Sequence, residues 1–150
     1  MAKEIERKYL VKNQIWDKII KPDFKLIHQG YIMDAGGTTI RVRYTDEKGL
    51  LTIKSNQNRI SRDEFEYEIP FDDAVNIYKN LCTKKLIKRR YKIICFEKLW
   101  EVDVYLGKLE GLIIAEIELN SEDEMIIESP IWVGDEVSYD IKYSNASLAS

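Results

Sequence analysis

Glu64-Phe65-Glu66-Tyr67-Glu68-Ile69 alternates acidic and apolar side chains at every position. Successive side chains of a β-strand point to opposite faces, so this spacing predicts a strand with one acidic and one apolar face. The same alternation recurs in residues 4–9, 41–44, 51–54, 88–93, 100–106 and 115–119. Short links such as Ala35-Gly36-Gly37 connect several of these segments, and such links favour antiparallel neighbours. The chain is therefore predicted to hold at least seven strands in a mainly antiparallel sheet.

Apolar residues at helical spacing occur between these strands and near the end of the chain. Four segments are expected to be helical: residues 15–20, 74–82, 125–127 and 138–150. Pro22 should end the first helix, and Asp72 or Asp73 should cap the second. Ser121 and Glu124 have the spacing of a capping box ahead of the third. Helices covering the apolar faces of a sheet make the predicted fold class α+β.

Length and composition limit the class of protein. With 150 residues, 45% of them hydrophobic, residues 1–150 are expected to form one domain with its own core, which excludes whole-chain disorder. The 23 basic and 26 acidic residues leave a net charge of −3, which argues against a nucleic-acid binder. No apolar run is long enough to span a membrane and no signal peptide is recognisable, so a cytoplasmic location is expected. Cys82 and Cys95 lack metal-site spacing and are expected to be ordinary buried thiols.

The charged faces of the predicted strands are sorted by sign. The acidic pairs and triplets are Glu4/Glu6, Glu64/Glu66/Glu68, Glu101/Asp103 and Glu116/Glu118. The basic positions are Arg41/Arg43, Lys54 and Lys88/Arg90/Lys92. A face that meets only water usually mixes signs, because like charges on neighbouring strands repel. The alternative is a closed barrel whose interior carries these charges.

A barrel lined in this way needs a ligand, because unpaired buried charge is costly. A polyanion held with divalent cations such as Mg²⁺ or Mn²⁺ would satisfy both signs at once. Two carboxylates at positions i and i+2 of a strand point the same way, so Glu4/Glu6 and Glu116/Glu118 could share metal ions. Arg41 could grip phosphate with its planar guanidinium, as could Arg43. The residues thus predict a metal-dependent polyphosphate site.

The opening Glu4-Ile5-Glu6-Arg7-Lys8 resembles the ExExK signature of the CYTH superfamily, the triphosphate tunnel metalloenzymes. This superfamily includes bacterial inorganic triphosphatases, class IV adenylate cyclases, thiamine triphosphatases and RNA triphosphatases. The resemblance continues in order along the chain, through residues 29–31 (QGY), 39–43 (TIRVR), 51–54 (LTIK), 62–66 (RDEFE), 87–91 (IKRRY), 100–105 (WEVDVY), 115–119 (AEIEL) and 143–149 (YSNASLA). Lys142 departs from the arginine that the family often has before YSN.

The resemblance implies a closed eight-stranded antiparallel β-barrel with helices packed outside, and the eighth strand is expected at Gln29–Met33. It implies that the metal ligands are Glu4, Glu6, Glu116 and Glu118, with Asp103 or Glu66 completing the set. It also implies that the triphosphate is bound by Lys8, Arg41, Arg43, Lys54, Lys88 and Arg90.

The predicted reaction is metal-dependent hydrolysis of the terminal phosphoryl group of inorganic or organic triphosphate. Glu6, Glu66 or Glu118 would accept the proton of the attacking water, and the sequence does not choose among them. Tyr31 with Lys88 is an alternative proton-transfer pair. The substrate is a small molecule, with neither nucleic acid nor membrane as partner, and the protein is expected to be a monomer or a homodimer.

Three other functions remain open at this stage. A cyclase acting on ATP would need a pocket for the nucleoside, and no segment is clearly set aside for one. Thiamine triphosphate could stack on Trp16, Trp100 or Trp132, although core positions suit them better. A non-catalytic polyphosphate or nucleotide sensor would not need the paired carboxylates. His28, with no nucleophile or carboxylate at motif spacing, is expected to be structural.

Overall fold

The structure is a computed structural model, and it describes residues 2–55 and 60–150. Within these residues nine strands form one antiparallel sheet: β1 (Ala2–Val11), β2 (Phe24–Ala35), β3 (Thr38–Tyr44), β4 (Gly49–Ser55), β5 (Ser61–Ile69), β6 (Lys84–Cys95), β7 (Lys98–Tyr105), β8 (Ile113–Glu118) and β9 (Val133–Glu136). The helices are α1 (Asn13–Trp16), α2 (Phe71–Asn80) and α3 (Asn145–Leu148), with 3₁₀ turns η1 (Gly107–Leu109) and η2 (Ile141–Tyr143). None of the helices in the described part of the chain is long and apolar enough to cross a membrane.

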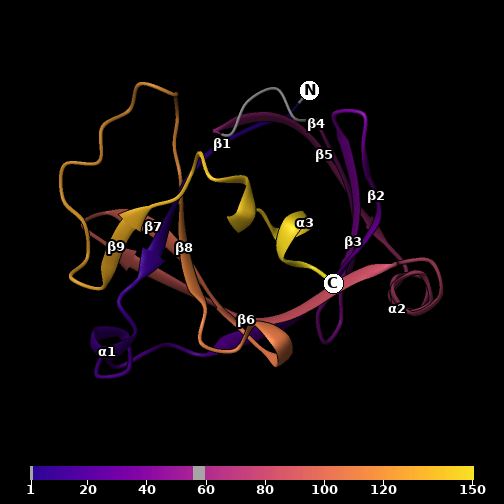
Figure 1. Ribbon diagram of the computed structural model, residues 1–150, viewed down its shortest axis with the longest axis horizontal. Coiled ribbons are helices and arrows are strands. Elements are labelled where there is room, and N and C mark those ends of the chain that lie inside the picture. Colours follow the sequence, from indigo (N-terminus) through magenta and orange to yellow (C-terminus); the bar gives the residue numbers. More distant parts are fainter. Residues whose placement is uncertain (1, 56–59) are drawn as a thin grey trace.

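The sheet closes on itself through β1. Its neighbours run in the order β5-β4-β3-β2-β6-β7-β8-β1, and β1 then pairs with β5. Residues 2–5 of β1 pair with β5, while residues 6–10 pair with β8 on the other edge. Strand β9 continues the β5 edge by pairing with Tyr9 and Val11. The predicted eight-stranded barrel is therefore confirmed, with β2 as its eighth strand and β9 as an addition outside the ring (Figure 1).

Period-two alternation gives the barrel wall an apolar outer face, and the larger of its outer cores lies over β6, β7, β8 and β1. Trp100, which is fully buried, contacts Trp132 edge to face, and Trp132 meets Trp16 in the same way at ring distances of 5.8 and 5.4 Å. Aromatic rings bury more area than any other side chain, so these contacts anchor α1 and the segment before β9 to the barrel. The tryptophans are core residues, as expected, and do not line the interior.

Helix α2 covers the outer face of β2, β3 and β4. Ala74, Tyr78 and Cys82 of this region pack against Val42. Gly30 is required here, because a Cβ atom at this position would lie 2.7 Å from the Cys82 sulfur. His28 stacks on Tyr44 in the same outer layer, with ring centroids 4.5 Å apart, so its predicted structural role agrees with its position.

Three helix predictions need correction. The first helix ends at Trp16, and residues 17–20 form turns ahead of Pro22. Helix α2 is confirmed, but Pro70 is its N-cap, and Asp72 and Asp73 lie in its first turn. Residues 121–130, all of which the structure describes, form no helix; Glu124 instead accepts a hydrogen bond from the backbone N–H of Asn120 and forms an ion pair with Lys98. Tertiary pairing thus overrides the capping-box pattern.

The predicted C-terminal helix is present, but it does not pack on the outside. Helix α3 lies in the middle of the ring of strands in the view of Figure 1. The Ser144 side chain caps it by accepting a hydrogen bond from the Ser147 N–H. The backbone of Ser150 exchanges two hydrogen bonds with Lys85 of β6, which fixes the end of the chain against the barrel.

Candidate functional site

The interior of the barrel is a cavity of about 840 Å³. Its wall consists of the inward-pointing members of the alternating strand pairs, as the charge pattern predicts. The acidic side chains that line it are Asp23, Asp34, Glu4, Glu6, Glu64, Glu66, Glu101, Glu116 and Glu118. The basic side chains that line it are Lys8, Lys25, Arg41, Arg43, Lys48, Lys54, Arg62, Arg90 and Lys92. The charges that appeared sorted by strand in the sequence therefore face one enclosed space.

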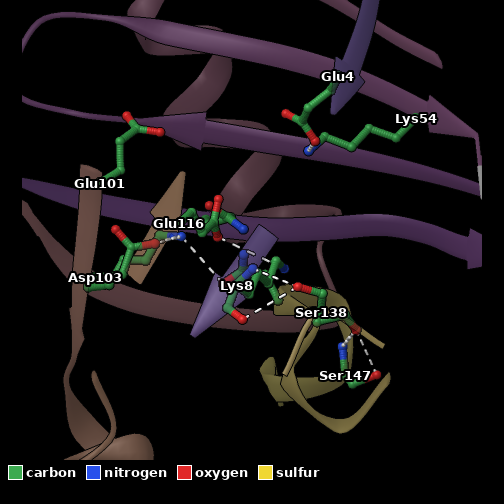
Figure 2. Close-up of polar contacts among 12 residues, drawn as sticks. Glu4, Lys8, Lys54, Glu101, Asp103, Glu116, Ser138 and Ser147 are labelled. Carbon is green, nitrogen blue, oxygen red and sulfur yellow. Dashed lines mark hydrogen bonds and ion pairs between the residues drawn. The ribbon is translucent and has the colours of Figure 1, made fainter. Parts of the chain in front are cut away.

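Ion pairs across the strands hold part of this charge. Lys54 of β4 lies 2.9 Å from Glu4 of β1, across the seam where the barrel closes (Figure 2). Lys54 also lies 3.2 Å from Glu64 of β5. Burial alone would raise the pKa of Glu4, but Lys54 and hydrogen bonds from Glu64 and Lys54 lower it to about 2. Glu4 is thus held as a carboxylate at the seam.

Asp103 forms the most buried ion-pair cluster. Its Oδ1 lies 2.8 Å from Arg90 Nε, and its Oδ2 lies 2.9 Å from Arg90 Nη2 and 2.7 Å from Lys88 Nζ. Burial would raise the pKa of Asp103, yet the two cations lower it to about 2. The same burial lowers the pKa of Lys88 to about 7, against the opposing effect of Asp103. Lys88 is therefore a lysine that can change protonation near neutral pH.

The two arginines of β3 have different partners. Arg41 Nη2 lies 3.2 Å from the Thr52 hydroxyl and 3.5 Å from Glu66 Oε2, and Thr52 in turn donates to Glu66. Arg43 forms no ion pair within the described residues, and its guanidinium is held by the neutral side chain of Gln29. Burial, together with the neighbouring charges of Arg41 and Arg90, lowers the pKa of Arg43 to about 10. No carboxylate of the described residues lies within ion-pair distance of it, although Asp103 opposes this lowering from farther away.

The carboxylates of β1 and β8 form an acidic wall. Glu6 and Glu118 are direct partners in the strand register, and Lys8 lies beside Glu116 with an Nζ–Oε1 distance of 3.9 Å. Burial and the negative charges of Glu116 and Glu4 raise the pKa of Glu6 well above its ordinary value. The pKa of Glu118 is also raised, by burial and by Glu4 and Glu101. Positive charge is thus short at Glu6 and Glu118, whereas Lys8, Arg90 and Lys88 hold the pKa of Glu116 well below its ordinary value despite its burial.

A hard divalent cation suits this donor set, because carboxylate oxygens are its preferred ligands and its charge would relieve the repulsion at Glu6. No three acidic, histidine or cysteine side chains of the described residues converge tightly enough to hold an ion as they stand. The carboxylates therefore fit a cation by chemistry and charge, although their present arrangement does not form a closed set of ligands.

Helix α3 closes one end of the cavity. The Asn145 side chain accepts a hydrogen bond from Tyr105 Oη at 2.5 Å and another from Lys88 Nζ at 3.3 Å. Behind it, Ala149 packs with Tyr31 and Leu86 in an apolar cluster, so this end of the barrel is filled by side chains.

The barrel brings together most of the residues that the sequence singled out. The residues predicted for binding, metal ligation or catalysis that line the cavity are Glu4, Glu6, Lys8, Tyr31, Arg41, Arg43, Lys54, Glu66, Arg90, Glu116 and Glu118. Lys88 and Asp103 are fully buried behind this lining. Lys142 is exposed beside Asp140, away from the cavity.

Sequence reasoning missed Gln29, Thr52 and Asn145 as parts of the site. Each is a neutral side chain, and the search for charge patterns passes over neutral residues. A signal existed for Gln29, which stands two positions before Tyr31 and so faces the same side of its strand. Asn145 lies in the YSNASLA segment that carried the resemblance, but its role was not predicted, because its partners Lys88 and Tyr105 are distant in sequence.

A closed antiparallel barrel with cationic and acidic walls facing one tunnel defines the class of protein. The model of the CYTH domain family matches residues 2–149. The chain belongs to this family, as its motifs indicated.

Sequence relatives and solved structures agree with this placement. An inorganic triphosphatase of Acetivibrio thermocellus is 43% identical over 149 residues, covering 99% of this chain and 94% of the relative. An inorganic triphosphatase of Nitrosomonas europaea is 31% identical over 153 residues, covering 97% of this chain and 96% of the relative. A crystal structure of an inorganic triphosphatase superimposes with a TM-score of 0.67 at 29% identity, covering 99% of this chain and 95% of that chain. A putative adenylate cyclase from Bacillus halodurans shares the fold, with a TM-score of 0.64 at 19% identity. The match covers 81% of this chain and 84% of that chain.

Proposed function

We propose that this protein hydrolyses inorganic triphosphate, releasing its terminal phosphate inside the barrel. The observation that carries the proposal is that Arg43, which has no ion pair among the described residues, and the carboxylate Glu6, whose pKa is raised, line one cavity. The triphosphatases that are 43% and 31% identical over nearly the whole chain support the same substrate. Residues 1–150 are proposed to act as one CYTH domain.

The cations of the cavity bind and orient the phosphate chain. Arginines bind phosphate oxygens through two parallel N–H groups, and Arg41 and Arg43 both project into the cavity. Lys8, Lys54 and Arg90 are proposed to complete the binding set. Charge on the transferred phosphoryl group is stabilised by these side chains, which is the main requirement of phosphoryl transfer.

Glu4, Glu6, Glu116 and Glu118 are proposed to hold Mg²⁺ or Mn²⁺. Such an ion, when bound, supplies charge neutralisation of phosphate oxygens and activation of water. Both oxygens of Asp103 are engaged by Arg90 and Lys88, so we propose that Asp103 serves as their counter-ion and that it stays outside the metal set.

Two routes for the water proton follow from the site. Glu6 is suited to accept it because its pKa is raised by burial and by Glu116 and Glu4, and Glu66 and Glu118 are the alternative carboxylates. Lys88, with a pKa of about 7, is suited to exchange a proton near neutral pH together with Tyr31. The first route predicts that substitution of Glu6 lowers kcat, and the second predicts the same for substitution of Lys88 or Tyr31.

Inorganic triphosphate is favoured over a nucleotide by the inorganic triphosphatases that are similar to this chain. The end nearest Asn145 is filled by α3 and its apolar cluster, which leaves no nucleoside pocket at that end. The putative adenylate cyclase similar to this chain shares the fold alone, so cyclisation of ATP is not favoured by a specific observation. A cytoplasmic location and a monomeric or dimeric state stay predictions from the sequence.

The test is phosphate release from inorganic triphosphate with Mg²⁺, with Mn²⁺ and with a chelator. Glu4→Gln and Arg41→Ala should each lower kcat/KM by about 100-fold, the scale at which a single preorganised charged contact acts in a transition state. Lys142→Met removes an exposed lysine outside the cavity and should leave turnover unchanged.

Full activity in chelator, or undiminished activity of both cavity variants, would contradict the proposal. ATP and thiamine triphosphate are assayed in parallel, with cyclic AMP measured as a product. Tight binding of triphosphate without turnover under either metal would instead indicate a sensor.

A further inference from the structure

Gln29 links two residues of the cavity through three hydrogen bonds. Its Oε1 accepts from Arg43 Nε at 2.9 Å and from Arg43 Nη2 at 2.8 Å. Its Nε2 donates to Tyr31 Oη at 2.7 Å. Gln29 is fully buried, and both partners line the cavity. The amide is therefore enclosed between a phosphate-binding cation and a tyrosine hydroxyl.

The orientation of this amide is fixed by chemistry. An arginine side chain has donors but no acceptor, so the atom of Gln29 that faces Arg43 must be its carbonyl oxygen. The amino group then necessarily faces Tyr31, because the two ends of an amide point apart. The contact with Arg43 therefore fixes the orientation of the Gln29 amide, so that its amino group faces Tyr31.

The hydroxyl of Tyr31 must act as the acceptor in its bond with Gln29. A phenolic hydroxyl has one proton, and Gln29 Nε2 already supplies the proton of this bond. The proton of Tyr31 is consequently left for a partner other than Gln29. Because Tyr31 lines the cavity, a phosphoryl oxygen of the substrate can be that partner.

The neutral side chain of Gln29 has a second consequence. A glutamate in its place would accept both the bonds from Arg43 and the proton of Tyr31. It would also neutralise Arg43, which forms no ion pair within the described residues. A neutral amide can therefore bind both residues at once. It leaves the positive charge of Arg43 unneutralised and the hydroxyl proton of Tyr31 free for another acceptor.

We propose that Gln29 is a positioning residue that directs the hydroxyl proton of Tyr31 toward the bound triphosphate and holds the Arg43 guanidinium in place. Gln29 itself does not touch the substrate. The inference rests on the proposed triphosphatase function. It adds that Tyr31 donates a hydrogen bond to the substrate, and that the neutral residue Gln29 sets the direction of this bond.

A double-mutant cycle tests the part of the proposal that concerns Tyr31. Gln29→Met keeps the length of the side chain and removes both kinds of hydrogen bond. With Tyr31 present, Gln29→Met should lower kcat by about tenfold or more, the scale of one lost hydrogen bond to a charged group. In the Tyr31→Phe background, the same substitution should lower kcat by less than about threefold, since contacting residues are non-additive.

Loss of Arg43 orientation should appear separately, as a rise in KM in both backgrounds. A merely structural role for Gln29 predicts equal kcat losses in both backgrounds, and that result would overturn the proposal. An active Tyr31→Phe enzyme with unchanged kcat would overturn it as well. His28→Gln is the matched control, because His28 is adjacent on the same strand but faces the outer layer; its kcat should stay unchanged.

A measurement without turnover separates this proposal from the proposed function. The side-chain amide of Gln29 is observed by proton–nitrogen NMR and assigned by its disappearance in Gln29→Met. Tyr31→Phe should shift one of its two amide protons upfield, because that proton loses its acceptor. An unchanged amide signal would show that Gln29 does not donate to Tyr31, whether or not the chain hydrolyses triphosphate. Absence of hydrolysis with the expected shift would contradict the triphosphatase alone.

Discussion

At the scale of single residues, the same kind of side chain has different chemical states in this barrel. Lys54 forms ion pairs with two carboxylates at the seam between β1 and β5. Lys88 is fully buried, and burial lowers its pKa to about 7. Asp103 keeps its charge only because Arg90 and Lys88 surround it. Replacing one member of such a buried group leaves the others unpaired, which is far more costly than losing an exposed pair.

We expect Asp103→Asn to lower the free energy of unfolding by about 3 kcal/mol, the lower range for breaking a buried ion pair. Glu101→Gln is the matched control on the same strand, where the pair with Arg90 is longer, at 3.5 Å, and more exposed. That variant should cost under about 1 kcal/mol. Urea unfolding in the presence of chelator measures both, and equal losses would contradict the counter-ion role of Asp103.

At the scale of elements, the short helix α3 has more influence on the site than the longer helix α2. Helix α2 covers the outer face of β3 and contributes to the core there. Helix α3 has four residues, too few to be stable alone, and is held by its Ser144 cap and by contacts with the barrel. Its Asn145 contacts Lys88 directly, so α3 forms part of the wall at the closed end of the cavity.

Removal of residues 145–150 should open the closed end of the cavity. We expect the ratio of ATP to inorganic triphosphate hydrolysis to rise about tenfold or more, because a nucleoside could then enter the space that α3 fills. Ser147→Ala keeps the helix and should leave the ratio unchanged. Phosphate release from each substrate gives the ratio, and thermal denaturation confirms folding; an unchanged ratio in a folded truncated protein would contradict this role of α3.

At the scale of the whole molecule, the barrel depends on a short seam. Among the described residues, the strand register between β1 and β5 covers residues 2–5 of β1, and Lys54 of β4 reaches across this seam to Glu4. Burial would raise the pKa of Glu4, but Lys54 and a hydrogen bond from Glu64 together lower it to about 2, below its ordinary value of 4.5. A carboxyl group with a lowered pKa contributes stability above its unfolded pKa and loses it as the pH falls through the folded pKa.

The contribution of Glu4 should therefore be complete above pH 4.5 and disappear as the pH falls toward 2. In Lys54→Met the largest cause of the lowered pKa is absent. We expect the difference in unfolding free energy between the natural chain and Lys54→Met to shrink from about pH 5 to about pH 2.5. Urea unfolding across this range measures the difference, and a constant difference would show that the seam pair is not the source of acid sensitivity.

Much of the architecture was predictable from local patterns. Alternation with a period of two identified the strands from residues such as those of β5, and it placed the charged side chains on one face. Two features of the connections were not predictable in this way. The turn between β6 and β7 is made by Phe96 and Glu97 with positive φ angles of 51° and 63°, although neither residue type favours that conformation. Likewise the helix expected after Ser121 is absent from the described chain.

The sequence by itself determined which strands form, which side chains share a face, and the two signs of charge that the interior carries, because these depend on spacing along a single strand. The tertiary structure decided which charges are neutralised. Asp103 is paired with Lys88 and Arg90, Arg43 instead meets the neutral Gln29, and α3 enters the ring of strands. These arrangements depend on barrel closure, which brings residues as distant as Lys88 and Asn145 into contact, and no local pattern encodes such a distance.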